Sequence, residues 1–194
     1  DADRVVLNDN GTMVQVAVTD LSAYFDDEIT AMPNLVTVGA ANTLTTVAGI
    51  PFYQGNTGSI YTHDVSGTDD TATGNTAFGI TAMDAITTGD NNSAFGLDAL
   101  TANTTGTKNI AIGTGAGKSI TTAGEFTAVG YNAGLFATGG SNTYVGEAAG
   151  RGVDGSSTAT NNIAVGRNAL YSYTTGSNNT AVGKDALLAN TTGA

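Results

Sequence analysis

The residue types that carry out catalysis or bind metals are few in this chain. It contains no cysteine and a single histidine, His63, which Asp64 follows directly. Without cysteine there is no thiol catalysis, no zinc–thiolate site and no disulfide. A His-Asp neighbour acts as a general base only with a nucleophile or substrate group within hydrogen-bond reach, and the sequence offers none at a recognisable spacing. We therefore interpret His63 as a surface turn residue and predict no catalytic residue.

Three carboxylates near this histidine could in principle hold a calcium ion. Asp64, Asp69 and Asp70 lie in a stretch rich in Gly, Ser and Thr, and calcium takes oxygen ligands. They follow neither the EF-hand spacing nor the nonapeptide pattern of calcium-binding solenoids. We predict no metal, no cofactor and no enzymatic activity; a glycan hydrolase carried on a longer fibre is the enzymatic alternative.

The charge balance excludes two classes of partner. Seventeen acidic residues oppose six basic ones, which gives a net charge of −11. Such a chain has no basic surface to follow a phosphate backbone, so we predict no nucleic-acid binding. No stretch approaches the roughly 18 consecutive apolar residues that read as a membrane-spanning helix, so we also predict no membrane insertion.

A five-residue pattern, close to Asn-x-Ala-x-Gly, recurs seven times in residues 75–194. The glycines that end it are mostly 17 residues apart, with one interval of 16 and one of 20, and an alanine follows each glycine three residues later. Three columns of equivalent residues result: an apolar column of Phe78, Phe95, Ile112, Val129, Val145, Val165 and Val182; repeat glycines Gly79, Gly96, Gly113, Gly130, Gly146, Gly166 and Gly183; and repeat alanines Ala82, Ala99, Ala116, Ala133, Ala149, Ala169 and Ala186.

The repeat predicts a parallel β-solenoid. A short alternating segment ended by Gly is typical of a strand, with its second and fourth residues on one face and Asn, Ala and Gly on the other. One apolar side chain per strand cannot bury itself in an isolated 17-residue unit, whereas equivalent strands stacked about 4.8 Å apart form a continuous column. We predict an all-β fold of about seven such coils with the apolar column as its core.

The small-residue columns leave alternatives open. Gly at the strand end suits a positive φ or a close backbone approach. The alanine column indicates either a narrow coil interior or a surface against which another chain packs. The Asn column suits a turn position or a stacked amide ladder. The longer interval between Gly146 and Gly166 is either plain length variation or a loop extruded on a binding face.

The first third of the chain differs from the repeats. Residues 4–9 and 12–18 read as two strands around Asn10-Gly11, a strong hairpin turn signal. Thr19 is a plausible N-cap for a short helix through Phe25. We predict three segments: residues 1–33 as a joining or trimerisation segment, 34–74 as an irregular β transition segment, and 75–194 as the solenoid.

The repeat resembles a known family. Asn109-Ile-Ala-Ile-Gly113 and Asn179-Thr-Ala-Val-Gly183, each with its spaced alanine, are similar to the head repeats of trimeric autotransporter adhesins, although the family's unit is shorter than 17 residues. In that family the repeats form a left-handed parallel β-roll, and three rolls form a head that attaches cells to surfaces. Residues 3–25 resemble a lead-in segment of bacteriophage tail-fibre proteins, which often carry adhesin-like repeats.

The resemblance implies a structural segment of a phage tail fibre, located in the virion, that presents a receptor-binding tip. Its partners would be two further copies in a homotrimer, other tail or fibre proteins, and a host cell-surface receptor such as a glycan. The first alternative is a bacterial cell-surface adhesin or extracellular filament subunit. The second is an ice- or glycan-binding solenoid that uses the stacked threonines Thr88, Thr105, Thr122, Thr175 and Thr192.

Overall fold

The computed structural model describes residues 4–9, 12–17, 46–47, 50–51, 53–54, 59–62 and 71–193. The chain divides into two compact units, Asp1–Pro51 and Phe52–Ala194, and each is described by itself.

The first unit contains two antiparallel strand pairs. Strands β1 (Arg4–Asp9) and β2 (Thr12–Ala17) pair from end to end, so the predicted hairpin is confirmed. Strand β3 (Thr46–Val47) pairs with β4 (Ile50–Pro51). The short helix predicted to begin at Thr19 lies outside the described residues.

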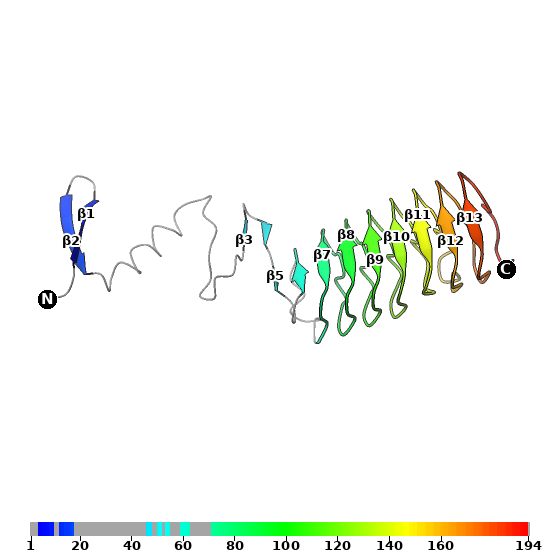
Figure 1. Ribbon diagram of the computed structural model, residues 1–194, viewed down its shortest axis with the longest axis horizontal. Helices are drawn as coiled ribbons and strands as arrows, with labels where there is room; N and C mark the ends of the chain where they lie inside the picture. The colour runs from blue at the N-terminus through cyan, green and yellow to red at the C-terminus, as the bar shows by residue number, and fades with distance from the viewer. Residues whose placement is uncertain are drawn as a thin grey trace. The chain divides into compact units, whose positions relative to one another are not determined.

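The second unit is a parallel β-solenoid, as predicted (Figure 1). Eight strands, β6 to β13, lie in one sheet in chain order, and β5 (Tyr53–Gln54) joins β6 in antiparallel pairing. The strands are β6 (Ile60–Tyr61), β7 (Thr76–Phe78), β8 (Ser93–Phe95), β9 (Ile110–Ile112), β10 (Thr127–Val129), β11 (Thr143–Val145), β12 (Ile163–Val165) and β13 (Thr180–Val182).

Backbone hydrogen bonds join each coil to the next along both the strand and the turn. In the sheet, Ala77 pairs with Ala94 and Ala94 pairs with Ala111 in exact register, so equivalent residues stack. In the turn, the Met83 amide donates to the Ala99 carbonyl oxygen at 3.0 Å and the Leu100 amide donates to that of Ala116 at 3.0 Å. This ladder satisfies the backbone polar groups of the coils, as a buried backbone requires.

The parallel sheet begins one strand before the first recognisable repeat. Strand β6 pairs in parallel with β7, although its sequence does not match the repeat pattern. Ser59 takes the place of the repeat Asn, and its hydroxyl accepts a hydrogen bond from the Asn75 amide at 3.1 Å. Tyr61 takes the place of the strand alanine and is buried. The start of the parallel sheet was missed because both marker residues are replaced here.

The interior of the coils is lined by small residues from the strands, and our prediction of the core was wrong. The middle residue of each repeat strand is buried, as Ala77, Ala94 and Ala111 show. The predicted core column lies on the outer face; for example, Phe78 is 43% exposed and Ile112 is 44% exposed. The assignment of residues to two faces was correct, but the inner face was misidentified, because two β-branched or aromatic residues per strand do not fit inside the narrow coil.

The turns also contribute large apolar side chains to the interior. Met83, Leu100 and Leu170 follow the repeat alanines and are fully buried. Ile86 lies three residues after Met83, and Ile120 lies three residues after Gly117 in its own turn; both are buried as well. The core therefore depends on residues that the strand pattern does not include.

Two coils place an aromatic ring where the others have a small residue. Phe126 stands in the Asn column and Tyr144 in the strand alanine column; both are buried, with their rings edge to face at 5.6 Å. In the same coils the residue after the repeat alanine is glycine, Gly134 or Gly150, and a Cβ there would overlap the ring of Phe126 or Tyr144. In these two coils the glycine of the turn thus leaves room for the ring, as close packing demands.

Candidate functional site

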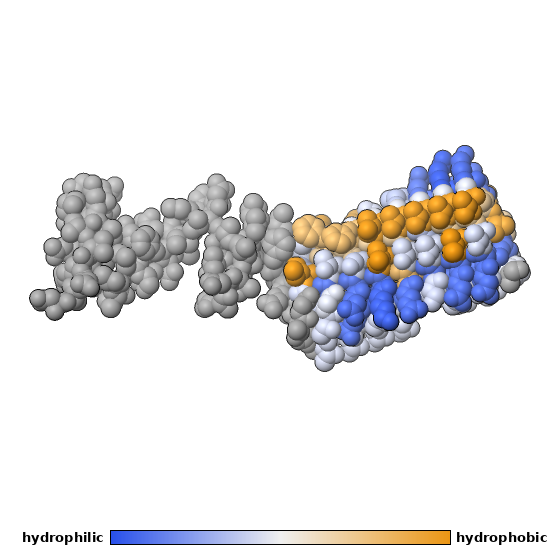
Figure 2. All heavy atoms as spheres, viewed as in Figure 1, coloured by the Kyte–Doolittle hydropathy of each residue, from blue (hydrophilic) through white to orange (hydrophobic). Residues whose placement is uncertain are grey.

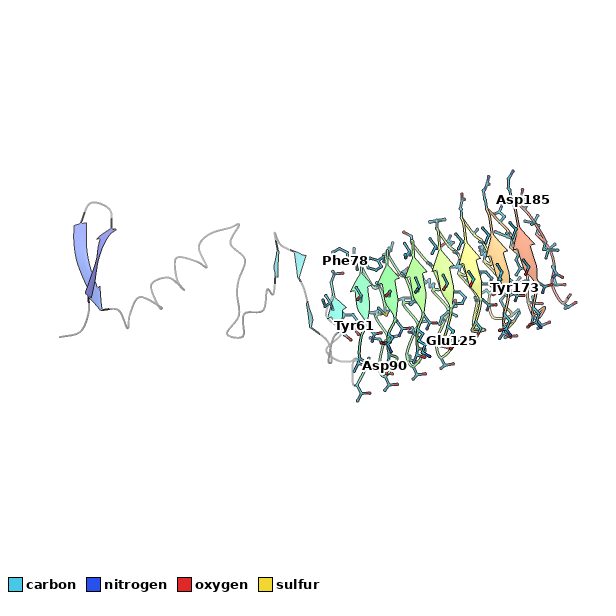
Figure 3. All side chains as sticks on the ribbon, viewed as in Figure 1. Tyr61, Phe78, Asp90, Glu125, Tyr173 and Asp185 are labelled. Carbon is cyan, nitrogen blue, oxygen red and sulfur yellow. The ribbon has the colours of Figure 1, made fainter. Side chains whose placement is uncertain are left out.

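The most prominent surface feature of the solenoid is a column of apolar side chains on the outer face of its sheet. It consists of the seven residues predicted as the core, and we call it the outer apolar column. Figure 2 shows it as a continuous orange band that runs over the strands along the solenoid, and Figure 3 shows Phe78 at its first coil. The rings of Phe78 and Phe95 stack with centroids 6.4 Å apart. Its members are Phe78, Phe95, Ile112, Val129, Val145, Val165 and Val182.

A second column on the same face carries no charge either. It is formed by the first residue of each repeat strand: Thr76, Ser93, Ile110, Thr127, Thr143, Ile163 and Thr180. Together the two columns present an uncharged face to solvent. Monomeric soluble proteins rarely expose a contiguous apolar patch of more than a few hundred Å², and larger patches mark interaction sites.

The residue after each repeat glycine borders this face and changes character along the solenoid. In the first coils it is apolar, and Ile80 is 74% exposed. In the last three coils it is Glu147, Arg167 or Lys184, all of them exposed. The uncharged face is therefore broadest at the N-terminal coils and is bordered by charge at the C-terminal coils.

The repeat glycines fulfil both roles predicted for them. Their φ angles lie between 120° and 142°, where L side chains are strained. A Cβ on Gly79 would also come within 2.5 Å of the Gly96 carbonyl oxygen in the next coil. Gly at the strand end thus allows the coils to stack at strand spacing.

The repeat alanines line the coil interior. Six of them are buried within the single chain, and Ala186 of the last coil is half-buried. Of the two explanations for this column, the narrow coil interior is correct. The alanines are consequently not a surface that another chain could contact.

The Asn column forms the predicted amide ladder. The Asn75 side-chain oxygen accepts the Asn92 backbone amide at 2.8 Å, and the Asn92 side-chain oxygen accepts the Asn109 backbone amide at 2.9 Å. Each side-chain NH₂ group donates to a carbonyl oxygen at the end of its own coil, as Asn162 does to Gly176 at 3.0 Å. Phe126 follows Asn109 in this column, and the Phe126 backbone amide donates to the Asn109 side-chain oxygen at 3.0 Å. These asparagines are structural rather than ligand-binding.

Charged side chains lie at the edges of the coils, with Asp90 and Glu125 at one edge and Asp185 at the other (Figure 3). Lys118 Nζ lies 2.8 Å from Asp98 Oδ2, and this hydrogen bond lowers the pKa of Asp98. A hydrogen bond from Asn168 likewise lowers the pKa of Asp185. Exposed pairs of this kind contribute little to stability, because water and salt screen them.

The longest repeat carries a loop at residues 153–156, which are all exposed. Its base is fixed by Ser157: the Val153 amide donates to the Ser157 hydroxyl at 2.6 Å, and that hydroxyl donates to the Tyr173 carbonyl oxygen at 2.7 Å. Directly before the loop, the guanidinium of Arg151 lies over the rings of Phe136 and Tyr171. Arg151 and Tyr171 each lie five residues after a repeat glycine, so the spacing already places them in adjacent coils, a signal that sequence reasoning missed. Phe136 lies six residues after Gly130, and the spacing does not mark it as their neighbour.

The threonines considered for ice or glycan binding are exposed at Thr88, Thr105, Thr122, Thr175 and Thr192. They do not form one uninterrupted array, because Gly139 stands at the corresponding place after Gly130 and the next coil contains the loop. The neighbouring threonines serve the fold, since the hydroxyl of Thr87 donates to the Thr104 carbonyl oxygen at 3.0 Å.

The residues considered for catalysis or calcium binding, His63, Asp64, Asp69 and Asp70, lie outside the described part of the chain. Within the described part, no three His, Cys, Asp or Glu side chains gather closely enough to hold a metal ion. The same residues include no helix long and apolar enough to cross a bilayer.

Neither a scan against protein-family models nor searches of curated proteins and of solved structures gave a match.

Proposed function

We propose that this chain is a structural segment of a homotrimeric attachment fibre, and specifically of a bacteriophage tail fibre, in which the solenoid presents a receptor-binding tip. The observation that carries the proposal is the outer apolar column, in which every repeat strand from β7 to β13 places a Phe, Ile or Val on the outer face, all of them exposed except the half-buried Val129. Its partners would be two further copies of the chain, other tail or fibre proteins, and a receptor on the host cell.

The spacing of the column argues that its occupant is another copy of this chain. Equivalent side chains recur once per coil, at the strand spacing of about 4.8 Å. A second solenoid of the same rise brings an apolar residue opposite every one of them, in register from end to end, whereas an irregular surface would meet only a few. The absence of charge from both outward columns allows this face to be buried without unpaired ions.

The phage assignment draws on the sequence resemblance of residues 3–25 and places the chain in the virion. A bacterial surface adhesin or filament subunit would use the same solenoid and the same interface. The two differ in what adjoins the chain in its gene: neighbouring tail genes support the fibre, and a membrane-anchor sequence supports the adhesin.

Light scattering on the full chain tests the trimer. We expect a particle of three times the 19.3 kDa chain mass. Val145→Asp combined with Val165→Asp should convert it to a folded monomer, because two buried carboxylates per subunit would be unpaired at the interface. The matched control is Thr105→Asp with Thr122→Asp, which adds the same charge to exposed positions off the column and should remain trimeric. A wild-type chain that is monomeric at high concentration would overturn the proposal.

A further inference from the structure

Arg151 differs from every other cation of residues 71–193 in its surroundings. Lys108, Lys118, Arg167 and Lys184 each have a carboxylate oxygen within 4.0 Å. Within this part of the chain Arg151 has none, and its guanidinium carbon lies 4.7 Å from the Phe136 ring centroid and 5.2 Å from that of Tyr171. Its positive charge is therefore held in place without being neutralised.

Three successive coils build this arrangement, which we call the Arg151 clamp. The Phe136 amide donates to the Arg151 carbonyl oxygen at 2.8 Å, and the Gly152 amide donates to the Tyr171 carbonyl oxygen at 3.0 Å. These bonds fix the backbones of the three residues in adjacent rungs. The stacked rings then restrict the guanidinium, so little side-chain freedom remains to be lost when a ligand binds.

The two ring contacts leave the donors of the guanidinium without an oxygen acceptor. An aromatic ring attracts the positive charge but offers no oxygen to its N–H groups. Arginine carries five N–H donors in a planar fork that matches a carboxylate or another oxyanion in bidentate fashion. No side-chain or backbone acceptor within the described residues engages this fork, and each residue of the clamp is half-buried rather than enclosed.

The loop at residues 153–156 follows the clamp arginine closely in sequence, and its base is fixed. Ser157 closes its base by bonds to Val153 and Tyr173, while Val153 and Asp154 remain exposed. Arg151 and the loop both lie between Gly146 and Gly166, the longest interval between successive repeat glycines.

We propose that the Arg151 clamp binds an oxyanion of an acidic surface saccharide, a uronate carboxylate or a sugar sulfate. This inference rests on the proposed attachment function and names the class of receptor. The guanidinium fork pairs with the oxyanion in bidentate fashion, and Phe136 and Tyr171 hold the fork in the orientation that the anion meets. The trimer and the clamp use different surfaces, so each can fail without the other.

Isothermal titration calorimetry on the full chain tests the clamp with three probes: trigalacturonate, its fully methyl-esterified form, and a sulfated trisaccharide. We expect at least one anionic probe to bind and the neutral ester to bind at least tenfold more weakly. Binding of trigalacturonate alone identifies a uronate receptor, and binding of the sulfated probe alone identifies a sulfated one; both support the oxyanion site. Equal binding of the ester and of the anionic probes would overturn the proposal, as would failure of all three.

Variants separate recognition from a purely structural role. Arg151→Gln should lower the affinity for the anionic probe at least tenfold, and Arg151→Lys should also lower it, because it keeps the charge but loses the planar fork. Arg167→Gln is the matched control, since it removes an arginine that already pairs with Glu147, and it should leave the affinity within twofold. Unchanged affinity in Arg151→Lys and Arg151→Gln would overturn the proposal. Light scattering on the same samples scores the trimer independently.

Discussion

The ring of Tyr144 fills the space that a side chain at position 150 would need. A Cβ placed on Gly150 would overlap three atoms of the ring, and the Tyr144 ring is itself fully buried between coils. In the following coil the relationship is inverted: Ala164 stands at the strand position and Leu170 in the turn, both buried. In these two coils the interior therefore accepts one bulky group at this level, from the strand in one coil and from the turn in the other.

Substitution of Gly150 by Ala should destabilise the solenoid. The added methyl group must displace the Tyr144 ring in a closely packed interior, and overpacking of this kind costs about 1–3 kcal/mol. Denaturant unfolding followed by circular dichroism measures the change in the free energy of unfolding.

Gly155→Ala is the matched control for this prediction. Gly155 has a φ of 67°, close to the 53° of Gly150, but nothing lies within 4 Å of a Cβ placed there. Both variants place a Cβ on a backbone of similar positive φ. The difference between their free energies of unfolding therefore isolates the clash with Tyr144. Equal destabilisation of the two variants would contradict the packing argument.

Exchange of the bulky group between strand and turn should restore stability. Tyr144→Ala alone removes a buried ring and should cost about 3–5 kcal/mol. Tyr144→Ala with Gly150→Leu recreates the Ala164–Leu170 arrangement of the neighbouring coil and should recover at least half of that loss. The comparison needs the single and double variants in one denaturant series; a double variant no more stable than Tyr144→Ala would contradict it.

The sequence was sufficient to predict the solenoid because the same residue types recur at equivalent positions of each coil. Asn75, Asn92 and Asn109 recur where the amide ladder needs them, and the glycines recur where two coils come closest. The amide ladder and the close approach of the coils both involve backbone atoms. Each therefore requires the same residue type at a fixed spacing, which is visible in the sequence.

The sequence did not reveal which face of the strand lies inside. The size of Phe78 favours burial over that of Ala77 when one chain is considered alone, yet the coil encloses the alanine and leaves the phenyl ring on the outer face. The clue was the reciprocal pattern of Tyr144 with Gly150, which only makes sense for residues that share an interior. For the Arg151 clamp the clue was partial, because Arg151 and Tyr171 share one repeat position whereas Phe136 does not.

Removal of one asparagine side chain from the amide ladder should lower the free energy of unfolding substantially, although the side chain is small. The Asn162 side-chain oxygen accepts the Asn179 amide at 2.8 Å, and its NH₂ group donates to the Gly176 carbonyl oxygen at 3.0 Å. Asn162→Ala leaves these partners unsatisfied, at a cost of about 1–3 kcal/mol for each buried group. The neighbouring exposed Asn161 provides the control: Asn161→Gly suits its φ of 59° and should change stability by less than about 0.5 kcal/mol. Similar losses in thermal or denaturant unfolding of the two variants would contradict a structural ladder.

Alkaline pH should unfold the solenoid through its buried tyrosines. Burial raises the pKa of Tyr173 to about 12 and raises that of Tyr144 further, against an ordinary value of 10.0. Because the folded state holds these protons more tightly than the unfolded state, their contribution to stability is complete below pH 10.0 and is lost as pH rises from there through 12. Denaturant titrations at increasing pH should therefore show falling stability in this window.

Tyr173→Phe tests whether this residue is responsible. The variant keeps the ring and removes the titrating group, so its stability should fall less steeply between pH 10.0 and 12 than that of the wild type. The buried tyrosines should ionise only as the solenoid unfolds. Their tyrosinate absorbance, recorded on the same samples, should therefore rise as the β-sheet circular dichroism signal falls. A wild-type chain and a Tyr173→Phe variant with the same slope of stability against pH would show that the phenol of Tyr173 ionises without cost inside the coil, and would contradict its burial.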